Sequence, residues 1–135
     1  MSITTKKVSF DYDLTLSRQD VQDFCKEMMD KGADVYVCTF RTKDYNDALF
    51  KIVDKSTLAN SDLFEVTDKL GIPRENIIFT EMEEKSKFLT DDFIFHLDDD
   101  YTVLYDLRAN TKVPGVSVFK SAYKNKCLRL WEKRK

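Results

Sequence analysis

The sequence predicts an α/β fold: one domain with a five-stranded, mostly parallel sheet and helices on both faces. Short apolar runs alternate along the chain with stretches whose apolar residues recur at helical spacing. The runs at residues 35–38 and 93–97 show little polar alternation, which is typical of strands buried on both faces of a parallel sheet. A chain of 135 residues fits a single domain, residues 1–135.

The first part of the chain is expected to form two strands separated by one helix. Val8 and Phe10 favour a short strand that ends at Asp11. A capping box at residues 17–20 should open a helix, and Gly32 should end it in the left-handed conformation. The apolar stripe of this helix comprises Val21, Phe24, Cys25, Met28 and Met29, and residues 33–39 should form the second strand.

The rest of the chain repeats this alternation. We expect strands at residues 77–79, 93–97 and 116–119, and helices at residues 62–70 and 101–109 and at the basic C-terminus. A second capping box, at residues 80–83, should open a helix that carries Lys85. One helix face is expected among residues 48–53, followed by a connection at residues 56–60.

Composition indicates a soluble globular protein. Apolar residues make up 42% of the chain and charged residues 34%, with a net charge of -2. No apolar run reaches the ~20 residues of a membrane span, and the N-terminus has no secretory pattern, so a cytoplasmic location with no membrane partner is expected. The three cysteines lack paired spacing and are expected to be reduced core residues. Every charged residue from 120 to 135 except Glu132 is basic, which favours a solvated terminal helix over a polyanion-binding tail.

Polar residues gather at the predicted carboxyl ends of the strands, where open α/β sheets bind ligands. Clustered carboxylates repel one another unless a cation neutralises them, and Mg²⁺ prefers oxygen ligands. A hydroxyl and an ammonium group suit phosphate oxygens. The combination predicts phosphoryl transfer through an aspartyl-phosphate. The residues concerned are Asp11, Asp13, Thr39, Lys85, Asp98 and Asp99.

These residues carry a resemblance to a known family. Asp11-Tyr-Asp13-Leu-Thr15 resembles the Asp-x-Asp-x-Thr motif of the haloacid dehalogenase (HAD) superfamily of phosphatases. The strand ending at Thr39, Lys85, and the strand closed by Asp98 and Asp99 resemble its second, third and fourth motifs, in the same order. The resemblance spans residues 6–119 and implies a small, Rossmann-like phosphatase with a minimal cap or none.

The resemblance also implies a role for each residue. Asp11 would be the nucleophile and a Mg²⁺ ligand, and Asp13 the acid and base, with its backbone carbonyl on the metal. Asp98 would bind the metal directly. Asp99 would bind the metal directly or through a water molecule, or would hold one of the residues that do. Thr39 and Lys85 would hold the transferring phosphate.

Neighbouring residues compete for two of these roles. Lys85 shares a helical face with Phe88 and Leu89, whereas Lys87 points away, so Lys85 is preferred. Asp100 is expected to cap the helix that follows it. The sequence departs from the family pattern at Leu14, where many members have glycine.

Three further side chains have two interpretations each. Arg41 is interpreted as a phosphate-binding residue that grips a second phosphate or a substrate carboxylate, or else as a surface arginine. His96 lies within an apolar strand and is interpreted as a core histidine rather than a catalytic one. Tyr12, between the two acids, is a candidate for shaping the substrate site.

The spacing between motifs leaves no room for a cap domain after the first motif, and room for one helix, at about residues 44–54, after the second. The resemblance implies that such an open site serves a large substrate, such as a phosphoprotein or a nucleic-acid end, or that a neighbouring subunit of a homo-oligomer covers it. Arg41 and the basic C-terminus favour a phosphorylated small molecule such as a nucleotide, or a nucleic-acid 3′-phosphate. The alternatives are a receiver-like domain and a non-catalytic module that binds phosphate or metal.

Overall fold

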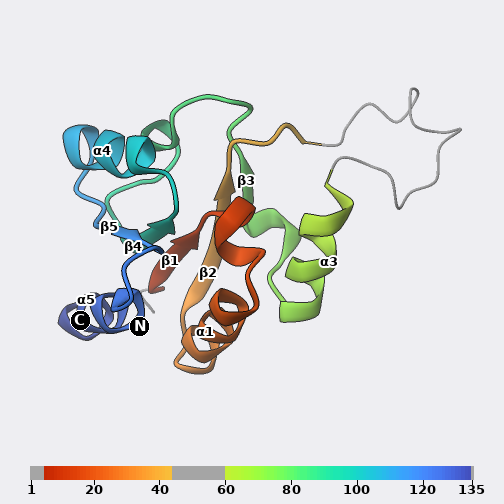
Figure 1. Cartoon of the computed structure of the whole chain (residues 1–135), viewed down its shortest axis with the longest axis horizontal. Coiled ribbons are helices and arrows are strands. Elements are labelled where there is room, and N and C mark those ends of the chain that lie inside the picture. Colours follow the sequence, from red (N-terminus) through yellow and green to blue (C-terminus); the bar gives the residue numbers. More distant parts are fainter. Residues whose placement is uncertain (1–4, 44–59, 135) are drawn as a thin grey trace, which may run out of the picture.

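A computed structural model describes residues 5–43 and 60–134 of the chain. Its five strands form one sheet in the order β3-β2-β1-β4-β5, and every pairing is parallel (Figure 1). The predicted fold class is therefore confirmed. The strands are β1 (Lys7–Phe10), β2 (Asp34–Thr39), β3 (Ile77–Phe79), β4 (Phe93–Asp98) and β5 (Gly115–Ser117).

Helices cover both faces of this sheet. On one face, α1 and α5 meet through an edge-to-face contact between Phe24 and Tyr123, with ring centroids 5.9 Å apart. On the other face, Val103 and Leu107 of α4 pack with Leu89 into a second apolar cluster. The helices are α1 (Gln19–Asp30), α3 (Ser61–Leu70), α4 (Tyr101–Asn110) and α5 (Tyr123–Lys133). None of the helices in the described ranges combines the length and apolar character that a membrane span needs.

Most of the expected elements are present. Gly32 and Gly71 follow α1 and α3 with φ of 99° and 85°, the left-handed conformation that glycine adopts without a Cβ clash. Asp100 caps α4, because its carboxylate accepts a hydrogen bond from the Thr102 N–H at 2.8 Å. All three cysteines are free and buried, as predicted for core residues.

Both predicted capping boxes are wrong. Helix α1 starts at Gln19 after Arg18, and the Ser17 hydroxyl instead accepts a hydrogen bond from the Leu14 N–H at 3.1 Å. The residues directly after Thr80 do not start a long helix. Lys85–Lys87 (η4) is one short 3₁₀ turn, and among the described residues the Thr80 hydroxyl has no hydrogen-bond partner.

The backbone beyond β3 explains the second error. The N–H of Thr80 donates to the Thr39 carbonyl at 2.9 Å, and that of Met82 donates to the Phe40 carbonyl at 2.9 Å. Strand pairing thus continues past β3 and uses the donors that a helix would need. Strand β5 also differs: it spans residues 115–117 rather than 116–119, and Phe119 is exposed beyond it. The helix face predicted at 48–53, the extra helix at 44–54 and most of the connection at 56–60 lie outside the described residues.

Candidate active site

The carboxyl ends of β1 and β4 bring the two expected pairs of acids to one edge of the sheet. These strands are neighbours, with Phe10 paired to Leu97. The Asp11 N–H extends the pairing by donating to the Leu97 carbonyl at 2.9 Å. Because Asp98 follows Leu97 directly, Asp11 and Asp98 lie side by side.

A sharp turn follows β1 and presents the first motif. In Tyr12–Leu16 (η1), the Leu16 N–H donates to the Asp11 carbonyl at 3.0 Å. Leu14 has φ of 60°, the left-handed region that a residue with a Cβ enters at a cost of about 1 kcal/mol. This is the position where many members of the resembled family have glycine, and the turn is made here without one.

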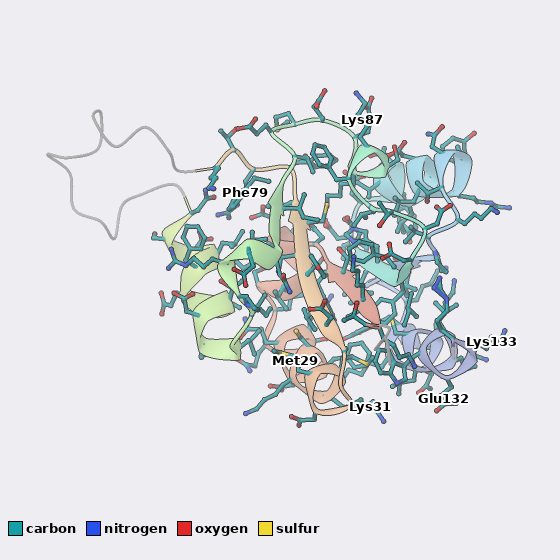
Figure 2. All side chains as sticks on the ribbon, turned by 180° about the vertical axis from the view of Figure 1, so that it is seen from behind. Met29, Lys31, Phe79, Lys87, Glu132 and Lys133 are labelled. Atoms are coloured by element: carbon teal, nitrogen blue, oxygen red, sulfur yellow. The ribbon has the colours of Figure 1, made fainter. Side chains whose placement is uncertain are left out.

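Lys85 bridges the two acids at the centre of the site. Its Nζ donates to Asp11 Oδ1 at 2.9 Å and to Asp98 Oδ2 at 2.8 Å, and its side chain is 1% exposed. Lys87 is more than half exposed and pairs with Glu83 and Glu84. Figure 2 shows Lys87 at the periphery of the molecule. Lys85 therefore faces inward and Lys87 outward, as expected, although a 3₁₀ turn carries them instead of an α-helix. The phosphate-binding role of Lys85 stays a prediction.

The turn that carries Lys85 is anchored to α4. Ser86 donates to Asp106 twice, from its hydroxyl at 2.8 Å and from its backbone N–H at 3.2 Å. The ring of Phe40 lies beside the amine, 4.8 Å from Lys85 Nζ to the ring centroid. These contacts leave Lys85 little freedom to swing away from the acids.

Burial and charge act in opposite directions on the pKa values of these groups. Burial raises the pKa of Asp11 to about 8, helped by the charge of Asp98 and opposed by Lys85. Burial would also raise the pKa of Asp98, but hydrogen bonds from His96 and Lys85 outweigh it and hold that pKa below its usual value. Burial disfavours the charged form of Lys85, yet the two carboxylates raise its pKa overall.

His96 is a buried histidine, as predicted, but it also contacts the site. Its Nε2 lies 2.6 Å from Asp98 Oδ2 and its Nδ1 2.8 Å from Ser9 Oγ. Burial lowers the pKa of His96 despite the neighbouring Asp98, which favours the neutral ring. An ionised carboxylate only accepts hydrogen bonds, so we assign the proton to Nε2, leaving Nδ1 to accept from the Ser9 hydroxyl.

Three acids form a group that could hold a metal ion. Carboxylate oxygens of Asp11, Asp98 and Asp99 all lie within 4.8 Å of one another. Oxygen atoms alone suit a hard divalent cation such as Mg²⁺. The side chain of Asp13 is not in this group, so only its backbone carbonyl, the atom implied by the resemblance, is left as a candidate ligand.

Asp13 instead meets Arg41 at the rim. Arg41 donates to Asp13 from Nη2 at 2.7 Å and from Nε at 3.1 Å, and to Asp62 of α3 from Nη1 at 2.8 Å. Its guanidinium carbon also lies 5.0 Å from the centroid of the Tyr12 ring. Arg41 therefore grips carboxylates of its own chain, and its expected contact with phosphate stays a prediction.

A pocket of about 180 Å³ opens over these groups. Among its lining residues, every charged side chain is an aspartate except Lys85, and Leu14 and Phe40 form its apolar wall. Thr39 is not part of the lining: it is 1% exposed, and its hydroxyl accepts from the Arg41 N–H at 3.3 Å. The expected role of Thr39 in holding phosphate stays a prediction as well.

Comparisons with known proteins do not assign this chain to a family. A scan of family models and searches of curated proteins and of solved structures all return no match. The resemblance of the four motifs therefore rests on the residues themselves.

Sequence reasoning missed four contributors to the site. His96 could have been found, because it precedes Asp98 by two residues and so shares its face of β4. Ser9 required the register between β1 and β4, which is irregular between Lys7 and Ser9. Phe40 and Asp62 carried no signal that set them apart from other aromatic and acidic residues.

Proposed function

We propose that this chain is a Mg²⁺-dependent phosphomonoester hydrolase of the haloacid dehalogenase type. One observation carries the proposal: five aspartates line the pocket, and among its described lining residues Lys85 alone is a cation, with Arg41 pairing Asp13 from the rim. Such a concentration of carboxylates, all but Asp13 buried or half-buried, favours a divalent cation, and a cation together with Lys85 favours a phosphoryl group. The substrate is a phosphorylated small molecule such as a nucleotide, or the 3′-phosphate of a nucleic acid.

In the proposed reaction, a carboxylate oxygen of Asp11 attacks phosphorus and the bond from phosphorus to the ester oxygen breaks. For this step Asp13 must leave Arg41 and be protonated, and it then gives its proton to the departing oxygen. Asp13 then takes a proton from water, which attacks phosphorus, releases inorganic phosphate and restores the Asp11 carboxylate.

The neighbouring groups prepare Asp11 for attack. Thr15 Oγ1 lies 3.3 Å from Asp11 Oδ2 and donates to it, and Lys85 holds the other oxygen. Asp11, Asp98 and Asp99 would hold Mg²⁺, which supplies positive charge for the phosphoryl oxygens and favours the ionised form of Asp11. His96 and Ser9 fix the orientation of Asp98 from behind.

The test measures phosphate release with Mg²⁺ from para-nitrophenyl phosphate, nucleotides, sugar phosphates and a 3′-phosphorylated oligonucleotide. We expect turnover by the wild type, none after chelation, and none from Asp11→Asn. Asp23→Asn on α1, a matched exposed acid outside the pocket, should keep full activity. Equal release by wild type and Asp11→Asn would show that Asp11 is not the nucleophile, and a metal- and phosphate-binding module without turnover would then be the better description.

A further inference from the structure

A second groove, of about 630 Å³, lies at the sheet edge formed by β5. Helix α4 forms one wall, and α5 contributes Lys126. In Figure 1, β5 lies between these two helices. A Cβ on Gly115 would come within 2.8 Å of Leu104 Cδ2, so glycine at this position allows α4 to lie close to β5. The backbone of Gly115 and the side chain of Leu104 therefore meet closely in the lining of the groove.

Two exposed tyrosines stand along the wall made by α4. Tyr101 and Tyr105 are 58% and 76% exposed, which is unusual for large aromatic side chains. They are four residues apart and so lie on the same helical face, whereas Val103 and Leu107 face the core. Within residues 5–43 and 60–134, neither ring stacks on another ring or on a cation, and neither hydroxyl is hydrogen-bonded.

The remaining charge of the groove is entirely positive. Arg108, Lys112 and Lys126 line it, all are exposed, and no acidic residue lines it. None of these three cations forms a salt bridge within the described part of the chain. The acid of α4, Asp106, is engaged elsewhere, by Ser86 and Asn110. In a chain of net charge -2, this is a local basic surface with aromatic faces.

The groove begins where the candidate active site ends. Asp100 lines the acidic pocket, and Tyr101, the next residue, lines the groove. From Tyr101 to Arg108 the helix rises about 10 Å. A polyanion lying along α4 would therefore bring its end to the acidic pocket.

We propose that this groove binds single-stranded nucleic acid, with bases stacked on Tyr101 and Tyr105 and phosphates beside the three cations. Aromatic stacking and backbone charge are how proteins hold single strands without reading sequence. Resting on the proposed hydrolase activity, the inference also names the substrate: the phosphorylated end of a single strand. This basic surface shares only Lys126 with the basic C-terminal segment, residues 120–135.

Binding is tested first, in chelator, so that it does not depend on turnover. Fluorescence anisotropy of labelled oligothymidylate and oligouridylate should rise on adding the wild type. Tyr105→Ala should weaken binding about 5-fold or more, since stacking contributes ~1–3 kcal/mol per base. Tyr105→Phe, which keeps the ring, should bind as the wild type does. Lys126→Glu should weaken binding and lower its salt dependence, whereas Lys31→Glu, at the far end of α1, should do neither.

The two proposals can fail separately. If the wild type hydrolyses para-nitrophenyl phosphate but does not bind either oligonucleotide, the groove proposal is wrong and the hydrolase stands. If oligonucleotides bind and Tyr105→Ala weakens that binding, but no phosphate is released from any substrate, the groove proposal is supported and the hydrolase proposal is wrong. Equal effects of Lys126→Glu and Lys31→Glu, or preference for a phosphopeptide over both oligonucleotides, would also overturn the groove proposal.

Discussion

The Nε2 atom of His96 lies 2.6 Å from Asp98 Oδ2, the same oxygen that accepts a hydrogen bond from the Lys85 ammonium. Ser9 holds the opposite ring nitrogen of His96. The chain of contacts therefore runs from the interior of β1, through β4, to the acids of the site. It gives Asp98 a fixed orientation before any ligand arrives.

We expect His96→Phe to lower kcat/KM by about 10- to 100-fold, the usual effect of removing a partner of a metal ligand. The Mg²⁺ concentration for half-maximal activity should rise, while KM for substrate changes little. His96→Gln, which can still donate to Asp98, should recover part of the loss. Ser9→Ala should have a smaller effect in the same direction. An unchanged Mg²⁺ requirement in folded His96→Phe and Ser9→Ala would show that the contact is only structural.

Replacing Lys85 tests whether it compensates the buried acids. Lys85→Met should destabilise the metal-free protein by about 3 kcal/mol, because it leaves two buried carboxylates without their cation. Mg²⁺ should restore a large part of this stability. Lys87→Met should cost less than about 0.5 kcal/mol, since both of its pairs are exposed. Urea unfolding with and without Mg²⁺ measures both variants, and equal losses would contradict the assignment.

The pKa of Asp11 predicts a pH dependence. Its value of about 8 in the folded protein exceeds that of an unfolded aspartate, about 3.9. Between these values the folded state binds a proton that the unfolded state lacks, so this group lowers stability as pH rises from about 4 to 8. In chelator, Asp11→Asn should therefore gain stability relative to the wild type between pH 5 and 8. If the melting temperatures of the wild type and Asp11→Asn changed in parallel with pH, this prediction would be wrong.

Asp62 predicts the opposite dependence at acidic pH. The hydrogen bond from Arg41 lowers the pKa of Asp62, so this ion pair contributes stability above about pH 4, and the contribution is lost as pH falls through the lowered value. Its carboxylate is 56% exposed, so Asp62→Asn should cost about 1 kcal/mol or less at pH 7. The difference from wild type should shrink as the pH falls below about 4 and through the lowered pKa of Asp62. A constant difference across this range would show that the contact is not ionic.

The sequence predicted the parts of this structure that depend on local composition. Strands β2 and β4 are nearly continuous apolar runs, which are typical of a sheet buried on both faces. The Lys85 assignment also followed from local pattern, because Phe88 and Leu89 marked its inward face. The convergence of Asp11 and Asp98 followed from the rule that strand ends share an edge.

The failures arose where distant backbone decides a local outcome. The capping boxes at residues 17–20 and 80–83 had suitable side chains, but a tight turn and continued strand pairing took their hydrogen-bonding groups. The contact between Ser9 and His96 depends on register, which no local pattern encodes. The pairing of Arg41 with Asp13 and Asp62 joins three separate elements and was equally invisible in the sequence.

The bridge formed by Lys85 has a consequence for how the protein matures. Because the Lys85 ammonium already lies between Asp11 and Asp98 and offsets part of their charge, we expect the polypeptide to fold with no ion present, unlike zinc fingers, which are unfolded without their metal. Folding and metal loading become separate events. In the proposed function, a Mg²⁺ ion would then bind to and leave a protein that is already folded.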